Sequence, residues 1–137
     1  MSRITISVIC PLYEAEKEIW RLDESLVMQE GVEIVEVFYV LTKGKDQTCK
    51  KMEQKKILER PNVRFMEILK KDFSHSLTRE TAAMQAKGEI LVFLTQDVEI
   101  KDKNFLYKLC LPIKEGEADA TYARQLTKYN NIEKYTR

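Results

Sequence analysis

The chain has 137 residues, of which 44% are hydrophobic and 33% charged, a composition typical of one soluble globular domain. Its 23 basic and 22 acidic residues nearly cancel, so it lacks the charge excess of a general nucleic-acid binder. No apolar run reaches the roughly 18 residues that a membrane-spanning helix needs. Cys10, Cys49 and Cys110 lie far apart without a CxxC pair, which predicts reduced cytoplasmic thiols rather than disulfides or a zinc site.

Apolar periodicity and turn residues predict alternating strands and helices. The expected strands cover residues 4–10, 34–41, 63–68, 90–95 and 120–126, and the expected helices cover about 14–29, 46–60, 76–86 and 102–111. Pro11 is expected to end the first strand, because proline cannot donate a hydrogen bond to a ladder. Asp46 is a candidate N-cap, and Gly88 is expected to close the third helix. The run at 90–95 is the most apolar, so we expect it in the middle of the sheet.

This alternation predicts an α/β fold with a mainly parallel central sheet and right-handed crossovers. Open sheets of this kind bind ligands beyond the carboxyl ends of their strands. The candidate binding segments are therefore residues 11–14, 41–46 and 95–99. We expect the loop at 72–79 to reach the same crevice.

Asp97 and Glu99 follow the most apolar strand at positions i and i+2. Mg²⁺ and Mn²⁺ prefer oxygen ligands, and commonly take one or two carboxylates together with phosphate oxygens. A cation held there would neutralise charge growing on a diphosphate leaving group. Asp97 is the better candidate, since Glu99 could equally point into solvent. A helix cap or a solvated loop remains the alternative interpretation of this spacing.

Two further segments carry side chains suited to a nucleotide. His75, the only histidine, and Arg79 lie where a helix is expected to begin, and helix N-termini and arginine forks both bind phosphate. Tyr13 could stack on a base or a sugar, with Glu14 beside it. The alternatives are a capped helix with surface side chains, and a tyrosine at the edge of the core. The lysines between residues 43 and 56 indicate a solvated helix face, or alternatively a phosphate-facing or membrane-surface role.

The opening run ISVICPLYEAEKEIWRLDESLVMQ resembles the first strand and helix of the family-two glycosyltransferases. In that family the first strand ends in a proline, and the positions of Ser25, Leu26 and Gln29 carry the same residue types. The run FSHSLTRETAAMQAKGEILVFLTQDVEI is similar to the centre of the family, and most similar to its rhamnosyltransferase-type branch. The later segment TYARQL also resembles that branch.

The resemblance implies a GT-A fold, a Rossmann-like three-layer sandwich. It implies transfer of a sugar, with inversion, from a nucleotide-diphosphate sugar to a hydroxyl of a glycan or lipid-linked acceptor. A candidate donor is dTDP-rhamnose, and the cofactor would be a divalent Mg or Mn ion. It also implies a cytoplasmic protein, peripheral to the inner face of the membrane. The nucleotide-sugar-binding residues would be Pro11, Tyr13, Glu14, His75, Arg79, Gln96 and Asp97. The resemblance makes Asp97 the metal ligand, and the spacing adds Glu99 as the second candidate ligand.

The chain departs from the family pattern at two positions. Leu41 occupies the place of an aspartate that usually contacts the base or ribose, and Glu80 follows Arg79 where the family has asparagine. Glu133 is the only acidic residue after Leu126, so we assign no general base. We infer that residues 1–137 form the N-terminal nucleotide-sugar-binding part of a longer domain whose acceptor part is missing.

Two other functions compete with a transferase. A degenerate, non-catalytic module that binds a nucleotide or a protein partner would explain Leu41 and Glu80. A receiver-like or flavodoxin-like signalling domain is disfavoured, because receiver domains place an acidic cluster after the first strand. Here that strand leads instead into Cys10, Pro11 and Leu12.

Overall fold

The computed structural model describes residues 3–72, 80, 84–121, 125–126 and 133–134. Its elements are β1 (Ile4–Tyr13), α1 (Ile19–Val27), β2 (Val32–Thr42), α2 (Thr48–Gln54), η1 (Ile57–Glu59), β3 (Val63–Ile68), η2 (Lys70–Asp72), β4 (Ile90–Phe93), α4 (Phe105–Lys114), β5 (Gln125–Leu126) and β6 (Glu133–Lys134). Glu80, Met84 and Gln85 are also helical, within the helix predicted there. None of the described helices is long and apolar enough to span a bilayer.

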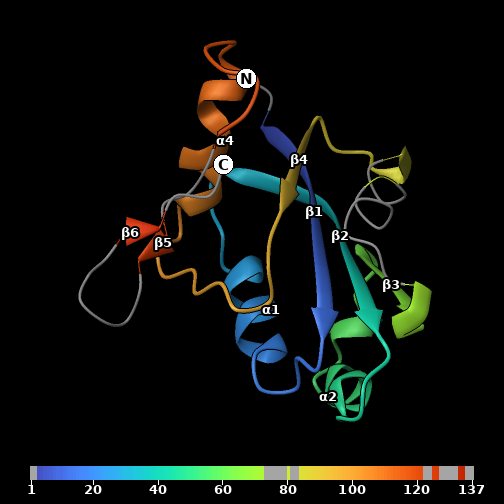
Figure 1. The fold of residues 1–137 in the computed structure, drawn as a ribbon. Coiled ribbons are helices and arrows are strands. Elements are labelled where there is room, and N and C mark those ends of the chain that lie inside the picture. Colours follow the sequence, from blue (N-terminus) through green and yellow to red (C-terminus); the bar gives the residue numbers. More distant parts are fainter. Residues whose placement is uncertain (1–2, 73–79, 81–83, 122–124, 127–132, 135–137) are drawn as a thin grey trace.

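A four-stranded sheet in the order β3-β2-β1-β4 organises the molecule (Figure 1). All its strand pairs are parallel, which confirms the predicted parallel sheet. In the described part of the chain β4 has β1 as its only neighbour, so β4 lies at the edge of the described sheet, whereas we predicted residues 90–95 in the middle. On one face of β4 the apolar side chains of Ile90 and Val92 point into the main core. Leu91, on the opposite face, remains 37% exposed.

The main hydrophobic core lies between one face of the sheet and the helices. Alternate β1 residues point into it, as the two-residue period of a strand requires. Its fully buried members include Ile6, Val8, Cys10 and Leu12 of β1, Ile19 of α1, Met52 of α2 and Leu106 of α4. Each large side chain buried in this way contributes about 1.5–3 kcal/mol. Burial is also the main reason why the pKa of the Cys10 thiol rises to about 12, so the thiol stays protonated.

β1 continues through Pro11, where the sequence predicts its end. The carbonyl of Ile9 accepts a hydrogen bond from Leu94 N at 3.0 Å, so the polar backbone groups of Ile9 face β4. Because backbone groups alternate in direction along a strand, those of Pro11 face the same side. The β4 pairing ends with Phe93 opposite Ile9. The missing N–H of Pro11 therefore removes no ladder hydrogen bond.

The first two helices are shorter than predicted. α1 starts later because Glu14 has a φ of 46° and Glu18 N then donates to Ala15 O in a turn, at 3.1 Å. α2 ends earlier because Lys56 has a left-handed φ of 59°, after which the chain continues as η1. Left-handed residues interrupt a right-handed helix, and nothing in a periodic apolar pattern reveals them.

The C-terminal third differs more from prediction. α4 starts later than residue 102 because Asp102 Oδ1 accepts a hydrogen bond from Asn104 N at 2.9 Å, in a turn before the helix. Thr121 is not in a strand; its hydroxyl donates to Leu109 O at 2.6 Å. Of the strand predicted over 120–126, the structure shows residues 125–126 as β5, which pairs antiparallel with β6. Residues 122–124 lie outside the described part.

A buried carboxylate connects α1 to the sheet. Asp23 is 3% exposed, and its Oδ1 accepts a hydrogen bond from the Tyr39 hydroxyl at 2.6 Å. Arg60 donates to both carboxylate oxygens, at 2.5 and 2.6 Å. Burial, followed by the charge of Asp23, holds the pKa of Tyr39 above its ordinary value, and the hydrogen bond to Asp23 raises the pKa of Arg60. We call these three residues the Asp23 cluster.

Candidate functional site at the carboxyl edge of the sheet

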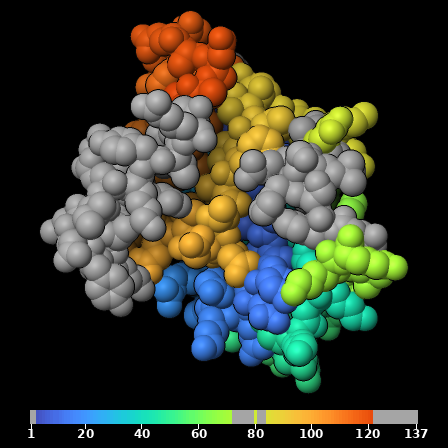
Figure 2. Space-filling model, viewed as in Figure 1, coloured from blue at the N-terminus to red at the C-terminus, as the bar shows by residue number. Residues whose placement is uncertain are grey.

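The loops that follow β1, β2, β3 and β4 come together at one edge of the sheet, as expected for parallel strands (Figure 1). Figure 2 shows the segment after β4, in orange, against the blue surface of the β1–α1 region. Lys43 N donates to Ile68 O at 2.7 Å, which joins the ends of β2 and β3. We call this region the carboxyl edge.

A side chain from the β4 loop fixes the end of β1. Gln96 Oε1 accepts a hydrogen bond from Tyr13 N at 2.7 Å. Two of the residues predicted from separate motifs therefore lie in contact. Asp97 follows Gln96, is exposed, and is near enough to Cys10 for its charge to add to the rise in the pKa of that thiol. Among the residues that the structure describes, none forms a hydrogen bond or ion pair with the Asp97 carboxylate.

Lys70 lies beside Tyr13, a contact that the sequence analysis missed. Lys70 Nζ is 3.4 Å from the Tyr13 hydroxyl and 5.2 Å from the centre of its ring. The tyrosine is 38% exposed, so part of its ring remains open to a planar ligand. The ammonium group adds positive charge next to that surface. The only signal for Lys70 in the sequence is its position just after β3.

The β1–α1 and β2–α2 loops brace each other. Ala15 N donates to Thr48 Oγ1 at 2.9 Å, and Glu16 N donates to Asp46 Oδ2 at 3.1 Å. In return, Gln47 N donates to Glu16 Oε1 at 2.9 Å. Asp46 Oδ1 also accepts hydrogen bonds from the amide and the hydroxyl of Thr48, and so stabilises the start of α2. We predicted Asp46 as the N-cap of this helix, but the N-cap is the next residue, Gln47. Such mutual bonding holds binding loops in place before a ligand arrives.

Glu14 adopts a strained backbone conformation at this edge. Its φ of 46° costs about 1–3 kcal/mol for a residue other than glycine, and such strain clusters at functional sites. The chain passes so close here that a Cβ at Gly44 would be 2.8 Å from Glu14 Cγ. Glu14 Oε1 also lies 3.5 Å from Lys45 N. The neighbouring loop therefore lies against Glu14 at the carboxyl edge.

Two predicted positions lie behind this edge. Pro11 pairs with Val40 inside the sheet and is half-buried, so it borders the site from below. Leu41, which the sequence analysis expects in the place of a family aspartate, is 4% exposed and belongs to the hydrophobic core. Because Thr42 is buried as well, Lys43 is the first exposed residue after β2.

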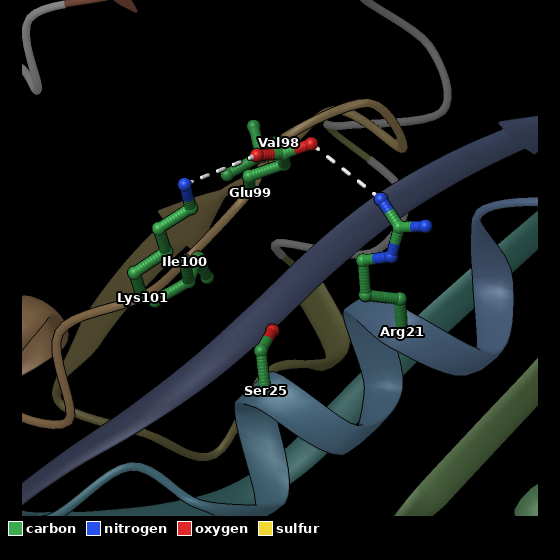
Figure 3. A pocket seen from close by; sticks show the side chains of 6 residues that line it. All are labelled: Arg21, Ser25, Val98, Glu99, Ile100 and Lys101. Atoms are coloured by element: carbon green, nitrogen blue, oxygen red, sulfur yellow. Dashed lines mark hydrogen bonds and ion pairs between the residues drawn. The ribbon is translucent and has the colours of Figure 1, made fainter.

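The predicted metal ligands face different surroundings. Glu99 forms ion pairs with Arg21 at 3.5 Å and Lys101 at 3.9 Å. These three residues line a cavity of about 260 Å³ between α1 and the segment after β4, with Ser25, Val98 and Ile100 (Figure 3). No group of three or more metal-binding side chains occurs among the residues that the structure describes. Mg²⁺ is usually bound by one or two carboxylates together with phosphate oxygens, a ligand set in which one exposed carboxylate such as Asp97 can take part.

Two predicted phosphate-binding residues, His75 and Arg79, lie outside the described residues. Glu80, the residue after Arg79, is helical and exposed. An exposed carboxylate is well solvated, so its charge weakens an adjacent anion site less than a buried one would.

Known proteins resemble this chain both in sequence and in structure. The sequence model named "Glycosyl transferase family 2" matches residues 7–137. Residues 1–349 of S. aureus TarS have a TM-score of 0.65 and 29% identity, over 81% of this chain and 32% of that chain. The same protein in complex with UDP-GlcNAc has a TM-score of 0.63 and 29% identity, over 81% of this chain and 31% of that one. No curated protein sequence matches significantly.

A more distant structure shows the same fold. Glucosyl-3-phosphoglycerate synthase from Mycobacterium tuberculosis, in complex with UDP, has a TM-score of 0.62 and 20% identity, over 84% of this chain and 41% of that chain. This chain spans less than half the length of the TarS 1–349 and synthase structures. Its parallel sheet with flanking helices is the GT-A architecture that the resemblance implies, and with the match over residues 7–137 the chain belongs to glycosyl transferase family 2.

Proposed function

We propose that this chain binds a nucleoside-diphosphate sugar at the carboxyl edge and supplies the donor half of an inverting glycosyltransferase. The observation that carries the proposal is the contact between Tyr13 and Gln96, which brings an aromatic ring and the exposed Asp97 carboxylate to one edge. The TarS structures with UDP and with UDP-GlcNAc support a donor of this class. The resemblance to the rhamnosyltransferase-type branch makes dTDP-rhamnose the alternative donor to a UDP-sugar.

The chemistry of the edge suits the parts of such a donor. Tyr13 would stack on the base, while Lys43, Lys45 and Lys70 would place positive charge near the diphosphate. Asp97 would hold a divalent cation that the diphosphate also ligates, whereas Glu99, the second ligand predicted from the sequence, forms ion pairs with Arg21 and Lys101. When bound, the cation would neutralise charge on the departing diphosphate.

The reaction of the whole enzyme would be a single in-line displacement. A hydroxyl of a glycan or lipid-linked acceptor attacks the anomeric carbon, the bond to the diphosphate oxygen breaks, and the configuration inverts. A general base must take the hydroxyl proton. Glu16 and Asp46, two carboxylates of the carboxyl edge without a proposed donor role, already accept hydrogen bonds from backbone amides, so we place the base outside this edge.

Calorimetric titration of the chain with UDP and with dTDP, with and without Mn²⁺, tests this proposal. Binding of either nucleotide that strengthens with Mn²⁺ is the expected result, and the tighter nucleotide identifies the base. Binding that is equal with and without the metal would remove the cation from the proposal. If neither nucleotide binds, the donor site is refuted for this chain.

Two substitutions should separate contacts to the base from contacts to the diphosphate. Tyr13→Ala should weaken UDP and uridine binding equally, about tenfold, because stacking acts on the base. Arg79→Ala should weaken UDP binding about 10- to 100-fold and leave uridine binding unchanged, because a charged hydrogen bond to phosphate is lost. Equal losses for both ligands in Arg79→Ala would show a structural arginine instead.

A degenerate module that binds nucleotide without turnover is the second candidate function. The buried Leu41 favours it, since the edge then lacks the aspartate that the family uses near the base. Donor hydrolysis or sugar transfer by the full-length gene product would exclude this alternative.

A further inference from the structure

The cavity of about 260 Å³ beside α1 has two walls. Arg21 and Ser25, one helical turn apart, form the wall on α1, and residues 98–101 form the wall on the segment after β4 (Figure 3). Its volume is just below the roughly 300–1,000 Å³ of pockets for drug-sized ligands. The cavity therefore suits a smaller group, such as a phosphate ester of one sugar or polyol.

Hydrogen bonds at both ends of the segment after β4 hold this cavity open. At one end Gln96 Oε1 accepts the hydrogen bond from Tyr13 N at 2.7 Å. At the other end Gln29, just after α1, donates from Nε2 to the carbonyl of Asp102 at 2.9 Å. Residues 98–101 lie between these two anchors and line the cavity together with α1. The fold thus sets the cavity before a ligand arrives, which lowers the cost of binding.

Two cations in the cavity share one carboxylate. Glu99 lies 3.5 Å from Arg21 Nη1 and 3.9 Å from Lys101 Nζ. The side chains of Arg21 and Lys101 are 75% and 87% exposed, and ion pairs that are this long and this exposed contribute little. The three side chains together leave an excess of positive charge. An anion is therefore favoured in the cavity, and it can bind the cations without breaking a strong interaction.

The cavity also presents oxygen atoms that accept hydrogen bonds. The Ser25 hydroxyl donates to Leu22 O at 2.6 Å, so its lone pairs remain for a donor on a ligand. The Glu99 carboxylate accepts hydrogen bonds as well. Cations together with such acceptors match a ligand that carries both an anionic group and hydroxyl groups.

The positions of the two cations favour phosphate over carboxylate as the anionic group. Arg21 comes from the wall on α1 and Lys101 from the opposite wall, with Glu99 between them (Figure 3). The oxygens of a phosphate point in tetrahedral directions, so one group can meet donors from both walls, whereas the two oxygens of a carboxylate share a plane. Arginine and lysine are both common phosphate-binding residues.

We propose that this cavity binds a phosphate ester of a sugar or polyol, as a subsite for the acceptor of sugar transfer. Val98, in the wall of the cavity, directly follows Asp97, the residue proposed to hold the metal of the donor. This subsite puts one part of the acceptor site within residues 1–137, which the sequence predicts to bind the donor. The acceptor role rests on the proposed function, whereas binding of the phosphate ester does not.

Titration of the chain with glycerol 3-phosphate, followed by the NMR shifts of its backbone amides, tests this site. Inorganic phosphate and glycerol, titrated in the same way, test the anionic group and the hydroxyl groups separately. The variants are Arg21→Gln and Lys101→Gln, and Lys108→Gln is the matched control. Lys108 is 69% exposed and pairs with Asp102 at 2.8 Å, away from the lining of the cavity, so its loss changes the net charge equally.

Glycerol 3-phosphate should shift the amides of residues 98–101, and should bind at least about tenfold more tightly than inorganic phosphate or glycerol. Arg21→Gln and Lys101→Gln should each weaken its binding about tenfold, the effect of losing one charged hydrogen bond, and Lys108→Gln less than about twofold. Equal losses in Lys108→Gln, or shifts confined to other residues, would overturn the proposal. Equally tight binding of inorganic phosphate would refute the hydroxylated ligand.

Glu99→Gln gives a second readout, because it removes the carboxylate that competes for both cations. Inorganic phosphate should bind this variant about threefold more tightly than the wild type, in the range of surface ion pairs. Weaker binding in Glu99→Gln would show that the carboxylate orders the two cations instead, and would count against an anion site.

The phosphate ester could be soluble or part of a lipid, and vesicles distinguish these sources. Phosphatidylglycerol in phosphatidylcholine vesicles presents a hydroxylated phosphate at a lipid surface. Sedimentation with these vesicles that is lost in Arg21→Gln and Lys101→Gln would identify a lipid-linked ester. Sedimentation that those variants leave unchanged would refute a lipid-linked ester in this cavity.

Competition with the nucleotide separates this inference from the proposed function. UDP, or dTDP if the wild type prefers it, is titrated with Mg²⁺ at saturating glycerol 3-phosphate. Both ligands should bind together, and displacement of the ester would assign Arg21 and Lys101 to the donor site and overturn a separate subsite. If the nucleotide binds and the ester does not, the donor site stands and the subsite is refuted. If the ester alone binds, the donor site is refuted and the acceptor role with it, while the phosphate site stands.

Discussion

Asp97→Asn should abolish the Mn²⁺-dependent part of UDP or dTDP binding and weaken the affinity by at least about 100-fold. Loss of a residue that only orients a metal ligand already costs up to about 100-fold, and Asp97 is proposed to bind the metal directly. The amide keeps the size of the side chain but removes the charge that a hard cation requires. Because Asp97 is exposed and bonds to none of the described residues, the melting temperature should not change. Calorimetry with and without Mn²⁺, together with a thermal melt, measures both.

Glu99→Gln is the matched control for this prediction. In the wild type the Glu99 carboxylate forms ion pairs with Arg21 and Lys101. We therefore expect Glu99→Gln to reduce nucleotide affinity by less than about threefold, an effect in the range of surface ion pairs. A loss as large as that of Asp97→Asn would establish Glu99 as the second ligand, released from its ion pairs when the donor binds. Unchanged Mn²⁺ dependence in Asp97→Asn would refute the metal role of that residue.

Asp23→Ala should destabilise the chain by about 3–5 kcal/mol, because it leaves the Arg60 guanidinium and the Tyr39 hydroxyl without their common acceptor. The carboxylate is 3% exposed and receives all the hydrogen bonds of the Asp23 cluster. Its loss also removes the hydrogen bonds that join α1 to Tyr39 of β2 and to Arg60, which precedes β3. Urea unfolding followed by circular dichroism gives the free energy of unfolding.

Smaller changes in the Asp23 cluster should have smaller effects. Tyr39→Phe removes one hydrogen bond and should cost about 1 kcal/mol, since the pair of Asp23 and Arg60 remains. Arg60→Lys keeps the charge but loses the paired geometry of the guanidinium, and should fall between the two. If Asp23→Ala costs no more than Tyr39→Phe, the buried ion pair adds nothing to stability.

The sequence predicted the sheet well because its strands are short apolar runs between turn residues. β3 was predicted with its bounds, and the rule that parallel strands bind ligands at their carboxyl ends assigned Tyr13 and Gln96 to the same edge, where they lie in contact. Apolar composition reports that a strand is covered, however, and not how many neighbours it has. Among the described residues β4 pairs only with β1, although its run is the most apolar in the chain.

Other features depend on backbone details that no periodic pattern carries. The left-handed conformation of Lys56 shortens α2, and the bulge at Val35 puts Glu36 beside Ser7. Lys70 reaches Tyr13 only because β3 lies where it does in the sheet. These contacts join residues far apart in the sequence, so they follow from the three-dimensional fold rather than from local propensity.

The strand order also sets the sequence of events in folding. β2 pairs with both β1 and β3, its neighbours along the chain, whereas β4 pairs Ile90 with Ile6, far apart in the sequence. Loop closure makes such distant pairing the slow step. The β1–β2–β3 unit should therefore form first, and the carboxyl edge should acquire Gln96 and Asp97 last. Competence to bind a donor would then appear only once β4 has paired with β1, so the binding site itself reports that this distant pairing has formed.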